Sequence, residues 1–148
     1  MYGYIFIIPI LFWFDQATKK KALSTFRNKE EQTVLGGRIV LTLHKNPGAM
    51  LGFLKKYPLV LLGLQVSFIF LSTFYFIYLI FQEGRTFWKW AFVFIIGGGL
   101  GNLWDRIHKG YVIDFFRYSK SRIVYNMADF FIFLGGFLGI IAEFVEKK

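Results

Sequence analysis

Residues 58–81 read PLVLLGLQVSFIFLSTFYFIYLIF, a run without any charged side chain that begins with a proline. A helix needs about 20 mostly apolar residues to cross a bilayer, and proline is well tolerated in the first helical turn, where its missing N–H costs nothing. Three further stretches, at residues 1–19, 87–104 and 126–145, are apolar enough to form comparable helices. We therefore expect an all-α membrane protein, in which four transmembrane helices form a single membrane-embedded domain over residues 1–148.

The composition supports this class of protein. Hydrophobic residues make up 55% of the chain, aromatic residues 22%, and the mean hydropathy is +0.47. A soluble domain of this length could not bury so many large side chains, so lipid must cover much of the surface. The net charge is +9, but the aromatic residues lie in the apolar runs rather than among the basic ones. We therefore expect membrane lipids with anionic headgroups as partners, and no nucleic acid.

Two longer segments, residues 20–57 and 106–125, connect the expected helices on one face, which we call the loop-rich face. Residues 33–43 contain two short β-prone pieces around a Gly-Gly turn, and residues 111–116 and 122–125 are β-prone as well. We expect a small β-sheet and loop region on this face. The opposite face has only the turn at residues 82–86 and the two chain ends.

All four aspartates, Asp15, Asp105, Asp114 and Asp129, fall on the loop-rich side of the expected helices. An acidic side chain at the centre of a membrane helix costs about 2.5–3.5 kcal/mol on insertion scales, so four gathered at one level suggest a functional site. Asp114 lies among large apolar residues, where desolvation favours the protonated carboxyl. A second carboxylate close by could share its proton, an arrangement that activates water for peptide hydrolysis.

Structural roles explain parts of this pattern as well. Asp15 and Lys19 have the i, i+4 spacing of a helical ion pair. Asp129 comes three residues after Asn126, as in a helix N-terminal cap, and on that motif alone capping is the better interpretation.

The segment around residues 97–106 is also open to two interpretations. Asn102 shares a helical face with Asp105 and Arg106 by i+3 and i+4 spacing. Arg106 could pair with Asp105, anchor the helix at the headgroups, or offer its planar fork to a carbonyl or phosphate. Glycines four apart, at Gly97 and Gly101 and again at Gly135 and Gly139, favour close helix packing over a phosphate-binding loop.

Other chemistries have little support. The chain has no cysteine, and its two histidines, His44 and His108, lack metal-ligand spacing. No serine lies in a recognisable protease setting. We expect no metal and no cofactor, which leaves carboxylate chemistry.

Five motifs taken together resemble the lipoprotein signal peptidase (signal peptidase II) family, bacterial inner-membrane aspartyl proteases with four helices. They are DQATK at residues 15–19, NPGAMLGF at 46–53, GGGLGNLWDR at 97–106, VIDF at 112–115 and YNMAD at 125–129. Each motif is weak alone, but five in the same order cover nearly the whole chain.

The resemblance implies that Asp114 and Asp129 are the catalytic pair, with one carboxyl acting as general base on a water and the other as acid to the scissile carbonyl. It places seven residues at the substrate pocket, namely Asn46, Gly48, Gly98, Asn102, Arg106, Asn126 and Ala128. We interpret Asp15, Lys19 and Asp105 as structural or orienting residues.

The implied substrate is a prolipoprotein whose cysteine carries diacylglycerol, and cleavage on the amino side of that cysteine releases the signal peptide.

The resemblance further implies a multi-pass protein of the bacterial inner membrane and a target of globomycin; we expect it to act as a monomer. It places the loop-rich face, and with it the active site, outside the cytoplasm. This face holds 14 of the 18 Lys and Arg residues, and the positive-inside rule alone would place it in the cytoplasm.

Two other functions are compatible with the residues alone. A small proton-coupled transporter could also hold carboxylates at the membrane edge, although transporters favour acids near the midplane. A non-catalytic assembly factor held together by glycine packing is the third possibility.

Overall fold

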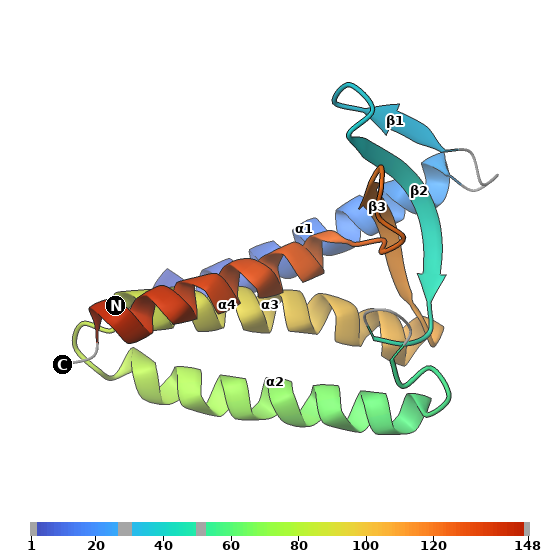
Figure 1. Cartoon of the computed structure of the whole chain (residues 1–148). Helices are drawn as coiled ribbons and strands as arrows, with labels where there is room; N and C mark the ends of the chain where they lie inside the picture. The colour runs from blue at the N-terminus through green and yellow to red at the C-terminus, as the bar shows by residue number, and fades with distance from the viewer. Residues whose placement is uncertain (1–2, 27–30, 50–52, 147–148) are drawn as a thin grey trace.

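Four long helices and a small sheet make up the protein, which is described by a computed structural model over residues 3–26, 31–49 and 53–146. The helices are α1 (Gly3–Thr25), α2 (Pro58–Ile80), α3 (Thr86–Lys109) and α4 (Met127–Val145). The strands are β1 (Gln32–Val34), β2 (Ile39–Asn46) and β3 (Val112–Tyr118), which gather at one end of the helices (Figure 1). The mostly helical architecture with one small sheet agrees with the fold class expected from the sequence.

Helix α3 is the centre of the bundle, because it packs against each of the other three helices, whereas α2 packs mainly on α3. Glycines allow these close approaches. A Cβ atom on Gly97 would lie 2.9 Å from the Cβ of Leu11 in α1, and one on Gly135 would lie 2.6 Å from the carbonyl oxygen of Ala91 in α3. The predicted role of the spaced glycines in helix packing is thus confirmed.

Two helices within the described residues, α2 and α4, are long and apolar enough to cross a membrane. Large apolar side chains of α2 point outward with most of their area uncovered, among them Leu59, Phe70 and Phe74. Such a surface is stable only in contact with lipid or another apolar partner.

Helices α1 and α3 extend further than their apolar runs predict. Helix α1 continues past Lys19 to Thr25, and α3 continues past Trp104 to Lys109, where Gly110 adopts the left-handed conformation that commonly ends a helix (φ 77°). Asp15 and Asp105, expected at helix ends, therefore lie inside helices. An apolar run marks the part of a helix that faces lipid, whereas residues such as Lys and Ala continue the helix into polar surroundings.

The sheet is antiparallel in the order β1-β2-β3. Residues 35–37 turn between β1 and β2 with positive φ angles, which confirms the two strands predicted around the Gly-Gly turn. The register between β2 and β3 shifts between Leu41 and His44, after which His44 pairs with Asp114.

Residues 122–125, in contrast, do not form the expected strand. Tyr125 makes a single bridge to Phe116, and the next residue, Asn126, is already the N-cap of α4. The helix start leaves too few residues for a ladder.

The end of the bundle opposite the sheet is closed by contacts between α3 and the end of α4. Arg85, the N-cap of α3, is left-handed and offers no side-chain cap to the helix. The carboxylate of Glu146 instead accepts hydrogen bonds from the backbone N–H groups of Phe87 (2.9 Å) and Trp88 (3.3 Å). Helix α3 thus receives its cap from a residue far along the chain.

Candidate active site

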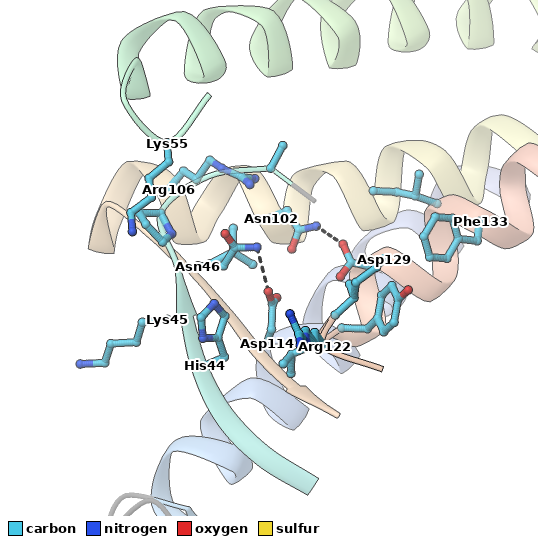
Figure 2. A pocket seen from close by; sticks show the side chains of 17 residues that line it. His44, Lys45, Asn46, Lys55, Asn102, Arg106, Asp114, Arg122, Asp129 and Phe133 are labelled. Carbon is cyan, nitrogen blue, oxygen red and sulfur yellow. Dashed lines mark hydrogen bonds between the residues drawn. The ribbon is translucent and has the colours of Figure 1, made fainter. Parts of the chain in front are cut away.

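A cavity of about 580 Å³ opens at the sheet end of the bundle, between β2, β3, α3 and α4 (Figure 2). Asp114 and Asp129 both line it, together with Asn46, Asn102 and Arg106. The cavity therefore brings together side chains from segments as distant in the chain as residues 46 and 129.

Asp114 is 2% exposed and lies on β3. Its Oδ2 accepts a hydrogen bond from Nδ2 of Asn46 (3.0 Å), and its Oδ1 accepts one from Nδ2 of Asn126 (2.7 Å). Burial, reinforced by the negative charge of Asp129, raises the pKa of Asp114 to about 7. This carboxyl is therefore poised to hold or release a proton near neutral pH.

Asp129 is the third residue of α4, where it forms a reciprocal capping box with Asn126. The backbone N–H of Asp129 donates to Oδ1 of Asn126 (2.9 Å), and the backbone N–H of Asn126 donates to Oδ2 of Asp129 (3.1 Å). The other carboxylate oxygen, Oδ1, accepts from Nδ2 of Asn102 (2.9 Å). The capping interpretation is correct, and it leaves the same carboxylate lining the cavity.

Asn126 connects the two aspartates directly. Its side chain is fully buried, and its Nδ2 donates both to Asp114 and to Oδ1 of Asn102 (3.1 Å), while its Oδ1 caps the N–H of Asp129. Within the described part of the chain, neither carboxylate forms an ion pair with a basic side chain. Neutral amides hold both groups in place, so the pair can exchange a proton without breaking a salt bridge.

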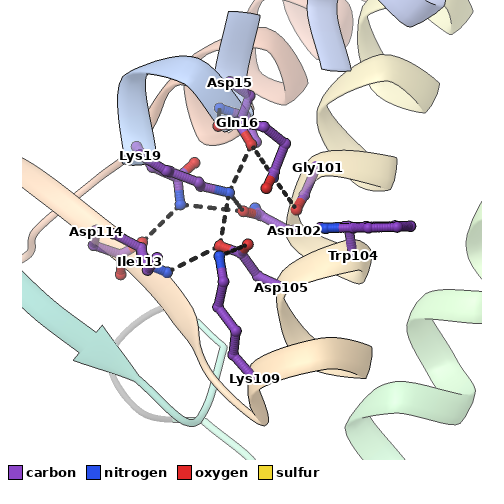
Figure 3. A network of polar contacts seen from close by, with 12 residues as sticks. Asp15, Gln16, Lys19, Gly101, Asn102, Trp104, Asp105, Lys109, Ile113 and Asp114 are labelled. Carbon is purple, nitrogen blue, oxygen red and sulfur yellow. Dashed lines mark hydrogen bonds and ion pairs between the residues drawn. The ribbon is translucent and has the colours of Figure 1, made fainter. Parts of the chain in front are cut away.

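A buried cluster of charges lies behind these amides (Figure 3). The ammonium of Lys19 contacts Oδ2 of Asp15 (2.7 Å) and Oδ2 of Asp105 (3.2 Å), and all three side chains are essentially without solvent contact. Lys109 pairs with the other oxygen of Asp105 (2.7 Å). Two acids and two bases balance one another, as a buried ionic cluster requires.

The same carboxylates fix the two segments that carry the aspartate pair. Oδ1 of Asp15 accepts from the backbone N–H of Ala128 at the start of α4 (2.9 Å), and Oδ2 of Asp105 accepts from the backbone N–H of Ile113, next to Asp114 (3.2 Å). A side chain on Gly101 would collide with the carboxylate of Asp15. These contacts are those of a structural or orienting role.

Lys19 also determines how the amide of Asn102 is turned. Oδ1 of Asn102 accepts from Nζ of Lys19 (3.0 Å) and from Nδ2 of Asn126. Since both partners are donors, only an oxygen can face them. The NH₂ group of Asn102 must therefore face Asp129.

Arg106 uses its fork for backbone and amide oxygens, not for Asp105. Nη2 donates to the carbonyl oxygen of Gly48 (2.7 Å), and Nη1 donates to Oε1 of Gln65 in α2 (2.9 Å). The N–H of Gly48 in turn donates to Oδ1 of Asn46 (3.0 Å). Arg106 therefore steadies the turn that presents Asn46 to Asp114, and the expected alternative of a pair with Asp105 is wrong.

The seven predicted pocket residues divide into two groups. Asn46, Asn102 and Arg106 line the cavity. Gly48, Gly98, Asn126 and Ala128 lie behind it: Gly48 and Asn126 provide hydrogen bonds, and Gly98 packs so closely on Ala128 that an added Cβ would collide with its carbonyl oxygen.

Several residues at this site were not predicted from the sequence. Gln65 is one, although a lone amide within the apolar run of residues 58–81 signals a need for a polar partner. Lys109 is another, placed four residues after Asp105 at ion-pair spacing. The Lys and Arg residues that line the cavity beside Arg106 were not singled out either, namely Lys45, Lys55 and Arg122.

Two carboxyl groups are held by amide side chains in one cavity at the end of a membrane helix bundle. This arrangement places the protein in the class of membrane aspartic peptidases. Comparison with known proteins agrees: the Peptidase_A8 family, described as signal peptidase (SPase) II, matches residues 7–145. The chain belongs to the signal peptidase II family, and the resemblance expected from its motifs is confirmed.

Individual relatives are similar over most of their length. The chain is 38% identical over 136 residues to a lipoprotein signal peptidase of Caldicellulosiruptor bescii, covering 91% of this chain and 85% of the relative. It is 34% identical over 143 residues to one of Neisseria meningitidis, covering 90% and 84%. A solved structure described as a bacterial membrane enzyme superposes with a TM-score of 0.78 at 25% identity, covering 98% of this chain and 91% of the other.

Replacing Lys19 by methionine should strongly destabilise the protein. The change leaves Asp15 and Asp105 buried without their shared cation, and removing one partner of a buried pair costs about 3–5 kcal/mol. We expect the melting temperature in detergent to fall by about 10 °C. The matched control is Lys20→Met, at an exposed position one residue along the same helix, which should stay close to the unchanged protein. Equal melting temperatures for the two variants would contradict the role assigned to Lys19.

Proposed function

We propose that this chain removes the signal peptide from prolipoproteins whose cysteine carries a diacylglyceryl group, by hydrolysis of the peptide bond on the amino side of that cysteine. The observation that carries the proposal is the pair of carboxyls, Asp114 and Asp129, joined through Asn126 in one cavity. Membership of the signal peptidase II family supports the reaction, and the names of its relatives support the substrate class.

The two carboxyls divide the chemistry between them. Asp114 holds the shared proton and donates it to the carbonyl oxygen of the scissile bond, while ionised Asp129 accepts a proton from the water that attacks the carbonyl carbon. The tetrahedral intermediate then collapses: the C–N bond breaks, Asp129 gives its proton to the leaving amine, and Asp114 recovers its proton from the hydroxyl. Both groups return to their starting states.

The cavity walls suit such a substrate. Asn46, Asn102 and Arg106 offer polar groups near the aspartates, whereas Ile132 and Phe133 of α4 form an apolar wall. We assign the polar side to the peptide and the apolar side to the lipid-bearing cysteine. Gly48, Gly98, Asn126 and Ala128 shape the site from behind, and Asp15, Lys19 and Asp105 orient it.

All four helices cross the bacterial inner membrane in this proposal. Helices α2 and α4 are apolar enough by themselves, and three charged residues of α1 and α3, namely Asp15, Lys19 and Asp105, are buried in contact with one another. Paired charges facing a bundle interior are the form in which membrane helices tolerate them. The described residues that line the cavity come from one chain, and we assign a monomer surrounded by lipid.

A proton-coupled transporter is not favoured. The acids gather at the sheet end of the bundle, where amides and a cavity surround them, and the chain belongs to a peptidase family. The assembly-factor hypothesis is weakened in the same way, because both candidate catalytic acids are present and held.

Changing either aspartate of the pair to asparagine should abolish cleavage, because the pair then loses its general acid or its general base. We expect Asp114→Asn and Asp129→Asn to lower the rate at which a purified lipidated precursor is cleaved by at least about 1,000-fold. Glu83→Gln, which removes an exposed acid from the turn after α2, serves as the control and should cleave normally. Substantial cleavage by a folded Asp114→Asn protein would refute the assigned mechanism.

The cleavage rate should fall as the pH rises above neutral. The raised pKa of Asp114, about 7, means that its proton is present below this pH and is lost above it. The acid required by the mechanism is then absent, so kcat should decline about tenfold for each further pH unit. The measurement is kcat between pH 5.5 and 9, with melting temperature recorded over the same range to exclude unfolding. A rate that keeps rising to pH 9 would contradict the assignment of Asp114 as the acid.

Despite its basic residues, the sheet end of the bundle should lie on the side of the membrane away from the cytoplasm. Lipid-modified cysteines emerge on that side. Because the chain has no cysteine, single cysteines report topology cleanly. We expect His44→Cys, at an exposed position on β2, to react with a membrane-impermeant maleimide in intact spheroplasts, and Glu83→Cys to react only after lysis. The reverse pattern would overturn the orientation.

A further inference from the structure

Three exposed basic residues line the cavity: Lys45, Lys55 and Arg122. We call them the cationic rim. Lys45 belongs to β2, Lys55 lies shortly before α2, and Arg122 lies between β3 and α4 (Figure 2). Three separate segments of the chain thus each bring a positive charge to the same cavity.

The basic residues deeper in the site are held by ion pairs or by hydrogen bonds. Lys19 and Lys109 are paired with aspartates, and Arg106 is held by Gly48 and Gln65. Among the described residues, no member of the rim forms an ion pair.

The ammonium of Lys45 lies 5.1 Å from the centre of the Tyr111 ring. Asp114 and Asp129, the carboxylates that line the cavity, are already engaged by amides. The positive charge of the rim is therefore available to a ligand.

The position of the rim indicates which part of a substrate would meet it. In the proposed reaction the signal peptide lies along the membrane helices, and the mature segment leaves from the sheet end. Lys55 is three residues before Pro58, the start of α2. Lys45, on β2, and Arg122, between β3 and α4, lie on the sheet and loop side of the cavity, so a segment that leaves the aspartate pair toward the sheet would pass near these charges.

We propose that the cationic rim is a specificity site that favours acidic side chains in the first few residues after the lipidated cysteine. This inference rests on the proposed function and adds a selectivity for the mature side of the cleavage point. Opposite charges across a wet, partly exposed interface increase association and select between partners. Anionic lipid headgroups are the less favoured occupant, because the three cations share the cavity with the aspartate pair, and a headgroup there would block the path of the peptide.

The test compares two lipidated precursors that are identical except at the second and third residues after the cysteine, which are both aspartate or both lysine. We expect the unchanged protein to cleave the acidic precursor with a kcat/KM about tenfold higher, chiefly through KM. The difference should shrink at 1 M salt, because exposed charges are then screened.

Matched variants show which residues cause the preference for the acidic precursor. The triple change Lys45→Gln, Lys55→Gln and Arg122→Gln should bring the ratio of the two kcat/KM values close to one. The control removes three exposed lysines from the same end of the bundle that do not line the cavity, Lys20→Gln, Lys21→Gln and Lys120→Gln, and should keep the preference. Arg122→Glu should shift the preference toward the lysine precursor.

Equal kcat/KM values for the two precursors with the unchanged protein would overturn the proposal. So would a cleavage rate that follows the fraction of phosphatidylglycerol in the vesicles and ignores the charge of the precursor. Binding of both precursors to the Asp129→Asn protein is measured in parallel. If the unchanged protein cleaves neither precursor but the acidic precursor binds more tightly to the Asp129→Asn protein, the proposed function fails and the rim proposal stands. If both precursors bind equally, the rim proposal fails.

Discussion

A single buried ammonium group connects the fold of this protein to its site. Lys19 has no contact with solvent and shares its charge between Asp15 of its own helix and Asp105 of α3, while it also donates to Asn102. Burying these charges is tolerable only because they satisfy one another. Asp15 holds the start of α4 and Asp105 holds β3, so the contacts that stabilise the bundle also place both aspartates of the candidate pair.

The polar groups around the pair are ordered by charge. Full charges lie deepest, in the cluster around Lys19, and neutral amides come next, with Asn46, Asn102 and Asn126 in direct contact with the carboxyls. Uncompensated basic side chains are farthest out, toward solvent. An amide N–H can donate a hydrogen bond to a carboxylate and also to the oxygen of a neutral carboxyl, although the bond to the carboxylate is the stronger. This layer therefore lets Asp114 and Asp129 change protonation without rearrangement, while the charges behind it stay fixed.

Local patterns in the sequence predicted most elements of the fold, and the family resemblance brought forward Asp114 and Asp129 as the candidate pair. Uncharged apolar runs identify the helices, a Gly-Gly turn identifies the hairpin, and Asn126 with Asp129 identifies a helix start. Helix ends were missed at Lys19 and Trp104, because hydropathy reports lipid contact and not hydrogen bonding. The orientation of the Asn102 amide and the partner of Arg106 depend on residues far apart in the chain, so no local pattern could reveal them. The division of motif residues into those that line the cavity and those behind it depends on packing for the same reason.

The cap that Glu146 places on α3 has a consequence for biosynthesis. Helix α3 begins without a side-chain acceptor of its own, and the N–H groups of Phe87 and Trp88 are satisfied by a carboxylate that follows them by almost 60 residues. In chain order, the first turn of α3 is translated almost 60 residues before that carboxylate. The first turn of α3 must therefore wait, hydrated at the membrane surface, until α4 has been translated and inserted beside it. The fourth helix thus completes the one at the centre of the bundle, so the order of synthesis becomes part of how this enzyme is assembled.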